Sequence, residues 1–196
     1  MITIIENFLT DSKVVHNINY SKFWEDKSYY FRKTNYKGFN TYEKKDTVGS
    51  YIVARMLEEP GLVGQYPFYT AYGYEYWPTV LLPGMETETD DSGEVYSLAP
   101  HSDYDVVKYM ETGVLSYPMF GAILYFGNED VEGGKLRIWN SVDMNEYKEI
   151  EPTHNSLVVF DSAKVHGVTE VTKGIRKSIA INFWQEQIMT EQGELN

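Results

Sequence analysis

The chain has 196 residues, a formal net charge of −12 at pH 7 and 42% hydrophobic residues. A chain of this length predicts a single domain, residues 1–196, that can bury an ordinary hydrophobic core. The acidic balance argues against nucleic acid as a partner, because proteins that bind the phosphate backbone normally present a basic surface.

The sequence contains no cysteine, which excludes disulfide bonds and thiolate metal sites. The segment Met1–Thr10 is a short apolar run without the basic region and the cleavage site of a signal peptide. No run reaches the roughly 18 apolar residues that a membrane span needs. These features predict a cytoplasmic protein with no membrane partner, and they leave the oligomeric state open.

Residues 1–68 are predicted to form an N-terminal strand and supporting helices. Ile2–Ile5 has the composition of a strand, and Thr10-Asp11-Ser12 offers an N-cap for a helix that runs to about Tyr20. Ser21–Tyr42 lacks clear periodicity and is expected to be irregular, with one extended segment. Asp46 could cap a second helix, which Pro60-Gly61 would end.

Residues 69–186 are predicted to form the core, because short β-rich runs alternate there with turn residues. Tyr69–Leu82 begins the core and ends at Pro83-Gly84, and Glu86–Glu94 is an acidic run expected to be a mobile loop. Further strands are predicted at Val95–Ala99, Phe120–Phe126, Lys135–Trp139, Ser156–Phe160, Val165–Val171 and Ser178–Trp184. This pattern is typical of an antiparallel sandwich or barrel.

Three residues have the composition of a metal site. His101 and Asp103 are two apart, so on a strand or the turn that leaves it they can face the same side. His166 supplies a second histidine later in the chain. Two histidines and one carboxylate form a facial triad that suits non-haem iron(II) and oxygen chemistry, although the same ligands also bind zinc.

Arg176 follows His166 at a spacing that suggests a second part of the same site. A 2-oxoacid that chelates iron has a distal carboxylate, and the planar guanidinium of Arg can pair with both of its oxygens. Strand alternation places Ser178 on the same face as Arg176, followed by Ala180 and Asn182. Tyr125 lies within a predicted apolar strand, where its hydroxyl needs either this carboxylate or a backbone partner.

The region from Tyr72 to Trp184 resembles the 2-oxoglutarate and iron(II)-dependent oxygenase superfamily, particularly its prolyl-4-hydroxylase-like branch. The matching motifs, in order, are His101-Ser-Asp103, Ile123-Leu-Tyr125-Phe, Glu132-Gly-Gly-Lys-Leu, Leu157-Val-Val-Phe160-Asp, His166-Gly-Val and Gly174-Ile-Arg176. The resemblance implies a mainly β fold with supporting α-helices, a double-stranded β-helix or jelly roll.

The resemblance also implies the site and its cofactors. His101, Asp103 and His166 would be both the catalytic residues and the iron ligands. Arg176 and Tyr125 would bind the distal carboxylate of 2-oxoglutarate, with Ser178 beside them. Fe(II), 2-oxoglutarate as cosubstrate and O2 would be required, and the family resemblance also allows ascorbate.

The implied reaction is hydroxylation of a C–H bond with release of succinate and CO2, and Asp103 favours it because halogenating relatives replace this carboxylate. A prolyl residue in a peptide or protein is the leading substrate, with a free amino acid or small metabolite as the alternative. A cupin-like ligand-binding jelly roll and a zinc hydrolase remain as alternative functions of other classes. Glu86–Glu94 and Tyr104–Pro118 flank the metal motif and are expected to form a lid and a substrate-binding wall.

Overall fold

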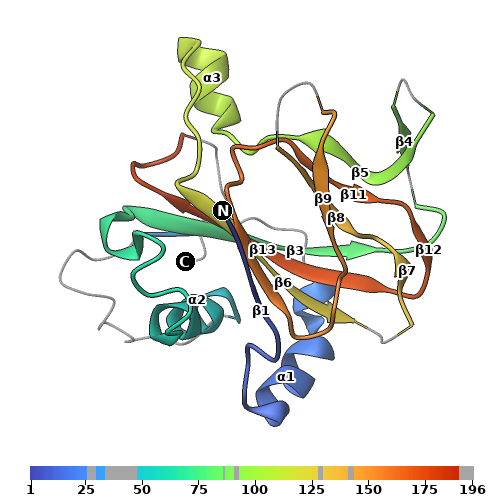
Figure 1. Ribbon diagram of the computed structural model, residues 1–196. Helices are drawn as coiled ribbons and strands as arrows, with labels where there is room; N and C mark the ends of the chain where they lie inside the picture. Colours follow the sequence, from blue (N-terminus) through green and yellow to red (C-terminus); the bar gives the residue numbers. More distant parts are fainter. Residues whose placement is uncertain are drawn as a thin grey trace.

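The computed structural model describes residues 1–25, 30–33, 48–85, 87–90, 93–127, 130–140 and 144–189. Most of its regular structure belongs to two antiparallel sheets that pack face to face, with helices on the outer face of the larger one (Figure 1). This is the mainly β jelly roll with supporting helices that the sequence predicts. Among the described residues, no helix is both long enough and apolar enough to cross a bilayer.

The larger sheet has six strands, and every neighbouring pair is antiparallel. In spatial order they are β1 (Ile2–Ile5), β10 (Leu157–Phe160), β6 (Phe120–Gly127), β13 (Arg176–Trp184), β3 (Gly73–Leu81) and β2 (Tyr30–Lys33). The N-terminal part of the chain therefore supplies both edge strands of this sheet, while β13 lies inside it.

The smaller sheet has five strands. In spatial order they are β4 (Glu88–Thr89), β5 (Val95–His101), β11 (His166–Thr169), β8 (Leu136–Trp139) and β9 (Tyr147–Ile150). A separate pair is formed by β7 (Glu132–Gly133) and β12 (Val171–Lys173). The predicted strand Val165–Val171 is thus divided between β11 and β12, because the chain leaves one ladder near Glu170 and enters another.

Strand β6 is buried on both faces of the larger sheet. Phe120, Ala122, Leu124 and Phe126 belong to the core under the helices, whereas Ile123 and Tyr125 belong to the core between the sheets. A strand covered on both faces reads as a continuous apolar run, as FGAILYFG does here. The predicted strand Phe120–Phe126 is confirmed.

Two helices cover the outer face of the larger sheet: α1 (Ser12–Asn19) and α2 (Val48–Glu58). The predicted N-cap of the first is confirmed, since the side chain of Asp11 accepts hydrogen bonds from the backbone N–H groups of Lys13 (2.9 Å) and Val14 (3.4 Å). The cap predicted at Asp46 lies outside the described residues. The expected extended segment within 21–42 is β2, preceded by the 3-10 turn η1 (Lys22–Glu25).

Two details of the core differ from expectation. The first part of Tyr69–Leu82 forms the end of a 3-10 turn, η2 (Phe68–Thr70), and β3 begins only at Gly73. The segment Tyr104–Pro118, for which no helix was predicted, contains helix α3 (Val106–Thr112). Its ends are defined locally, because the Asp105 side chain accepts from the Lys108 N–H at 3.1 Å and Gly113 adopts φ 71°, the left-handed conformation of a C-cap.

The acidic run Glu86–Glu94 also differs from the loop that was expected. Its described residues form the short strand β4, a turn and the approach to β5, with Glu88 opposite Tyr96. Val95 and His101 are the two ends of β5, so the length of this strand, about 20 Å, separates the hairpin from His101. The lid predicted for Glu86–Glu94 therefore has its described part at the far end of the strand from the metal motif.

Candidate metal centre

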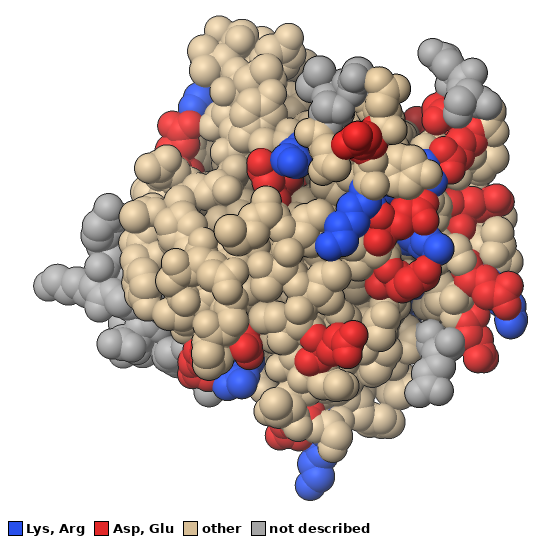
Figure 2. Space-filling model, in the orientation of Figure 1, with Lys and Arg blue, Asp and Glu red and all other residues tan. Residues whose placement is uncertain are grey.

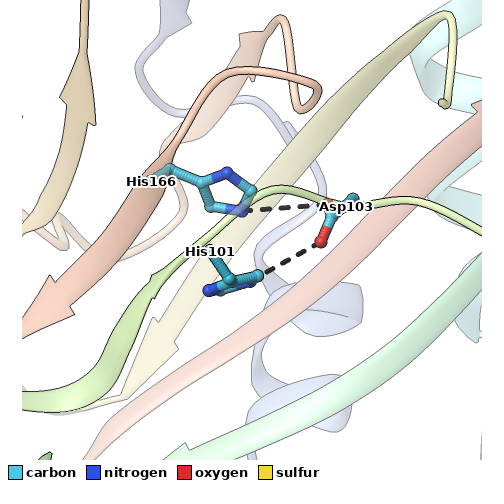
Figure 3. A group of neighbouring side chains, drawn as sticks. All are labelled: His101, Asp103 and His166. Atoms are coloured by element: carbon cyan, nitrogen blue, oxygen red, sulfur yellow. Dashed lines mark ion pairs between the residues drawn. The ribbon is translucent and has the colours of Figure 1, made fainter. Parts of the chain in front are cut away.

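The structure brings His101, Asp103 and His166 together. His101 ends β5, His166 begins β11, and the two are direct partners in the antiparallel ladder. Their rings face each other with centroids 4.5 Å apart. Asp103, in the turn after β5, places one carboxylate oxygen 3.6 Å from Nε2 of His101 and the other 3.7 Å from Nε2 of His166 (Figure 3). One potential ligand atom from each residue lies within 4.8 Å of the others.

The hydrogen bonds of the two rings select the tautomer that binds a metal. Nδ1 of His101 lies 2.8 Å from the carbonyl oxygen of Ala99, and Nδ1 of His166 lies 2.9 Å from that of Lys164. A carbonyl oxygen only accepts, so each Nδ1 carries a proton and the neutral ring keeps its lone pair on Nε2. Both Nε2 atoms point at Asp103 (Figure 3).

The charge states follow from burial and from the neighbours. Burial lowers the pKa of His166, which favours the neutral ring that a metal requires. For His101 burial also acts to lower the pKa, but the neighbouring Asp103 carboxylate and the Ala99 carbonyl, which stabilise the protonated ring, together outweigh it and the pKa is raised. Burial alone would raise the pKa of Asp103, yet the two histidines and Asn182 together lower it, so the carboxylate is ionised and can act as a ligand.

A cavity of about 200 Å³ joins the triad to the second predicted part of the site. It lies between the sheets, and Arg176, Ser178, Ala180 and Asn182 line it from β13. The predicted alternation of these residues on one strand face is confirmed. Within the described part of the chain, Asp103 is the one carboxylate among the residues that line the cavity.

Arg176 is 1% exposed, and no carboxylate pairs with it among the described residues. Its Nε donates to the carbonyl of Gly134 at 2.8 Å, and its Nη1 donates to Oγ of Ser178 at 2.9 Å. Burying an unpaired charge costs several kcal/mol, and burial accordingly lowers the pKa of Arg176. An anion bound in the cavity would neutralise this guanidinium.

Gly134 makes this position of Arg176 sterically accessible. A Cβ atom at residue 134 would lie 2.8 Å from Cδ of Arg176 and 2.9 Å from Cγ2 of Val171, and the backbone has φ 65°. Both facts require glycine. Sequence reasoning recognised Glu132-Gly-Gly as a family motif but assigned this residue no role.

Tyr125 is fully buried, and Cζ of Arg176 lies 5.1 Å from the centroid of its ring. Its hydroxyl makes no hydrogen bond of normal geometry among the described residues, and burial raises its pKa although the neighbouring Arg176 guanidinium acts to lower it. A buried hydroxyl without a partner is costly, which fits a ligand oxygen as its acceptor. Tyr125 is not among the residues that line the cavity, so its contact with a ligand stays a prediction.

Two further residues of the site were not assigned by sequence reasoning. Asn182, placed on the correct face without a role, donates from Nδ2 to Asp103 at 3.0 Å. Glu75 is a buried acid within the aromatic run of β3 and accepts from the same Nδ2 at 3.3 Å. The available signal was the charged residue in an otherwise aromatic strand, GYEYW.

The residues fit the metal and the anion that the motifs imply. The two Nε2 lone pairs and the ionised Asp103 form the donor set of a facial triad, and Arg176 supplies a positive charge that no carboxylate of the described residues pairs with. The triad and Arg176 line the same cavity.

Comparisons with known proteins agree with this arrangement. The 2OG-Fe(II) oxygenase superfamily model matches residues 90–185, which include all three triad residues and Arg176. The comparison with curated proteins found no match.

Three solved structures share the fold at low sequence identity. A prolyl-4-hydroxylase from Pseudomonas putida is 18% identical, with a TM-score of 0.54 over 95% of this chain and 93% of that one. IDO from Bacillus thuringiensis is 11% identical, with a TM-score of 0.59 over 95% and 90%. NgTET1 in complex with 5mC DNA is 14% identical, with a TM-score of 0.53 over 97% and 74%. The family match and the triad geometry together place residues 90–185 of this chain in the 2OG-Fe(II) oxygenase superfamily, whose members use Fe(II), 2-oxoglutarate and O2.

Proposed function

We propose that this protein is a dioxygenase that hydroxylates a C–H bond of a prolyl residue in a peptide or protein. One oxygen atom of O2 enters the hydroxyl group, and the other enters succinate as 2-oxoglutarate loses CO2. The observation that carries the proposal is a buried arginine that has no carboxylate partner among the described residues and lines the same cavity as a two-histidine, one-carboxylate triad.

In this proposal His101, Asp103 and His166 hold Fe(II). When bound, iron and 2-oxoglutarate supply the oxidative chemistry that amino-acid side chains lack. The backbone carbonyls of Ala99 and Lys164 keep the two rings in the metal-binding tautomer. Asp103 contributes a negative charge that partly neutralises the metal.

Arg176 binds the distal carboxylate of 2-oxoglutarate, with Ser178 holding the guanidinium in place and Tyr125 offering its hydroxyl. Apolar side chains of Ile123 and Leu136 form part of the cavity wall. They exclude water, and the attraction between the guanidinium and a carboxylate is stronger in such a low-dielectric site. The same positive charge makes the cavity selective for an acid of the right length.

The substrate is proposed to approach beside His101. The side chain of His101 is 38% exposed, whereas that of His166 is 7% exposed, so the triad is open on the β5 side. Helix α3 begins at Val106, shortly after Asp103, and stands out from the body of the molecule (Figure 1). Apolar side chains are exposed on and after it, namely Val106, Tyr109, Met110, Val114, Leu115 and Tyr117. This surface suits an uncharged prolyl segment. The proposal therefore retains Tyr104–Pro118 as the substrate-binding wall.

The charge distribution favours a peptide over a nucleic acid. The net charge is −12, and on the face drawn in Figure 2 Lys and Arg stand singly among acidic side chains, with mostly uncharged surface over α3. The DNA in the NgTET1 structure is bound by that protein and is not evidence of a nucleic-acid partner for this chain. A phosphate backbone would need a basic stripe.

The experiment is oxidation of a proline-containing peptide library with Fe(II), 2-oxoglutarate and O2, followed by mass spectrometry. A peptide that gains one oxygen atom at proline, with matching succinate, supports the proposal. Asp103→Ala and peptides with alanine in place of proline are the matched controls, and both should stay unmodified. Oxidation of free amino acids alone would replace the prolyl substrate by a small metabolite. Absence of succinate under every condition would contradict the dioxygenase reaction itself.

A further inference from the structure

Asp103 is the member of the triad with the least support from its own segment. β5 ends at His101 and α3 begins at Val106, so Asp103 belongs to neither element. Its backbone N–H donates to the carbonyl of Ser162 at 3.0 Å, which holds the main chain. The direction of its carboxylate must therefore be set by a group outside this turn.

The amide of Asn182 reaches that carboxylate. Its Nδ2 donates to Oδ2 of Asp103 at 3.0 Å and to Oε1 of Glu75 at 3.3 Å. An amide nitrogen has two N–H donors and no acceptor, whereas the side-chain oxygen would meet two acceptor oxygens if the amide were turned around. The two acids consequently determine which way Asn182 faces.

Glu75 is itself held by the strands on which it lies. It is the direct partner of Asn182 in the ladder between β3 and β13, and Nε1 of Trp184 donates to the same Oε1 at 3.0 Å. Burial raises the pKa of Glu75 to about 7, against the two hydrogen bonds that lower it, while the negative charges of Asp103 and Asp105 raise it further. Oε1 accepts both hydrogen bonds in either protonation state, because the other oxygen can carry the proton.

Gly121 leaves the space that this amide occupies. It lies opposite Asn182 in the ladder between β6 and β13. A Cβ atom at residue 121 would lie 2.8 Å from Oδ1 of Asn182 and 2.8 Å from Cβ of Ser162. Both neighbours act on Asp103, one through its carboxylate and one through its backbone.

We propose that Asn182 is a positioning residue that orients the Asp103 carboxylate toward the metal, and that Glu75 holds Asn182 in place. The inference rests on the proposed role of Asp103 as an iron ligand. Groups that hydrogen-bond to a metal ligand fix its orientation, and their loss typically weakens metal binding about 10- to 100-fold. Because Asn182, Glu75 and Trp184 lie on paired strands, the support is rigid.

Co(II) provides a direct test, because its visible absorption reports ligand number and geometry without turnover. The wild type should bind Co(II) with a spectrum that Asp103→Ala abolishes. Asn182→Ala should need about 10- to 100-fold more Co(II) for half-saturation and should give a changed spectrum. Glu75→Ala should show a smaller loss, whereas Glu75→Gln keeps the Oε1 acceptor and should restore wild-type binding.

Asn155→Ala is the matched control for the loss of a buried amide. Asn155 is 8% exposed, and its side chain exchanges hydrogen bonds with the backbone N–H (3.0 Å) and carbonyl (2.9 Å) of Leu9, in the segment before α1. This variant should lower the melting temperature and leave the Co(II) spectrum unchanged. If Asn182→Ala does not fold, Gly121→Ala displaces the same amide without removing a polar atom and should weaken Co(II) binding.

The outcomes separate this inference from the proposed function. Wild-type Co(II) affinity and spectrum in folded Asn182→Ala or in Gly121→Ala would overturn the positioning role while leaving the triad intact. A wild type that does not bind Co(II), or an Asp103→Ala variant that binds it as well as the wild type, would overturn the triad assignment and the positioning role with it.

Discussion

Two buried arginines of this protein have opposite surroundings. Arg137 on β8 is 5% exposed and donates to the carboxylates of Glu94 and Glu149, while its guanidinium carbon lies 4.1 Å from the centroid of the Tyr147 ring. Arg176 on β13 is 1% exposed and has only a carbonyl and a hydroxyl as acceptors among the described residues. Carboxylates of the described residues pair with Arg137, and none of them pairs with Arg176.

The difference separates a structural role from a binding role. Arg137 joins β8 to β9 and to the residue that precedes β5, so its ion pairs connect three parts of the smaller sheet. Arg176 gains no such compensation from the part of the chain that the structure describes, although removing a charge from water is costly. We infer that its energetic compensation comes from a carboxylate ligand, which agrees with its place in the cavity beside the triad.

The largest expected effect concerns folding without ligands. Arg137→Met should lower the free energy of unfolding by about 2–3 kcal/mol, because it removes hydrogen bonds to two carboxylates and leaves these acids side by side. Arg176→Met should change it by less than about 1 kcal/mol, since the variant replaces an uncompensated buried charge by an apolar side chain. Urea unfolding of both apo variants measures the contrast, and equal losses would show that Arg176 is structural.

A smaller effect is expected from the residue that lets Arg176 lie where it does. Gly134→Ala should raise the 2-oxoglutarate concentration for half-saturation about tenfold, equivalent to about 1.4 kcal/mol, because the new Cβ displaces the Arg176 side chain. Gly113→Ala is the control, since it introduces the same strain at a positive φ with no atom within 4 Å of the new Cβ. Anaerobic titration of the Fe(II) protein measures both. A titration curve for Gly134→Ala that coincides with that of the control would show that Gly134 has no effect on 2-oxoglutarate binding.

The smallest expected effect concerns Ser178, which supports Arg176 with a single hydrogen bond of 2.9 Å. Ser178→Ala should weaken 2-oxoglutarate binding by about 0.5–1.5 kcal/mol, the usual contribution of one hydrogen bond. Ser97→Ala, which removes a hydroxyl bonded to the backbone N–H of Val171, should leave it unchanged. Isothermal titration in the presence of Mn(II) compares the two, and equal affinities in both variants would remove Ser178 from the site.

The sequence predicted the parts of the site that depend on local periodicity. The spacing of His101 and Asp103 and the alternation from Arg176 to Asn182 follow from strand geometry, and the structure confirms that these side chains face one cavity. The antiparallel sandwich or barrel and most of its strands followed from the same kind of pattern, whereas the jelly roll followed from the family resemblance.

The partners of the buried charges could not be predicted in this way. Arg137 meets Glu94 across 43 residues of sequence, and Asn182 meets Glu75 across 107. Such pairs depend on which strands become neighbours, which periodicity does not encode. The sequence around β4 was predicted to be an acidic loop for the same reason. A strand of two residues is recognisable only through its pairing with β5. Helix α3 was missed although its caps, Asp105 and Gly113, are local signals.

The central claim is that Arg176 provides the charge that binds 2-oxoglutarate next to the metal triad. The most direct measurement is anaerobic titration of the Fe(II) protein with 2-oxoglutarate, following the visible metal-to-ligand charge-transfer band, in the wild type, Arg176→Met and Arg137→Met. The account predicts a band in the wild type, the same midpoint in Arg137→Met under conditions where it is folded, and a midpoint raised at least about 30-fold in Arg176→Met, equivalent to about 2 kcal/mol. The absence of a band in the iron-loaded wild type, or an unchanged midpoint in Arg176→Met, would contradict it.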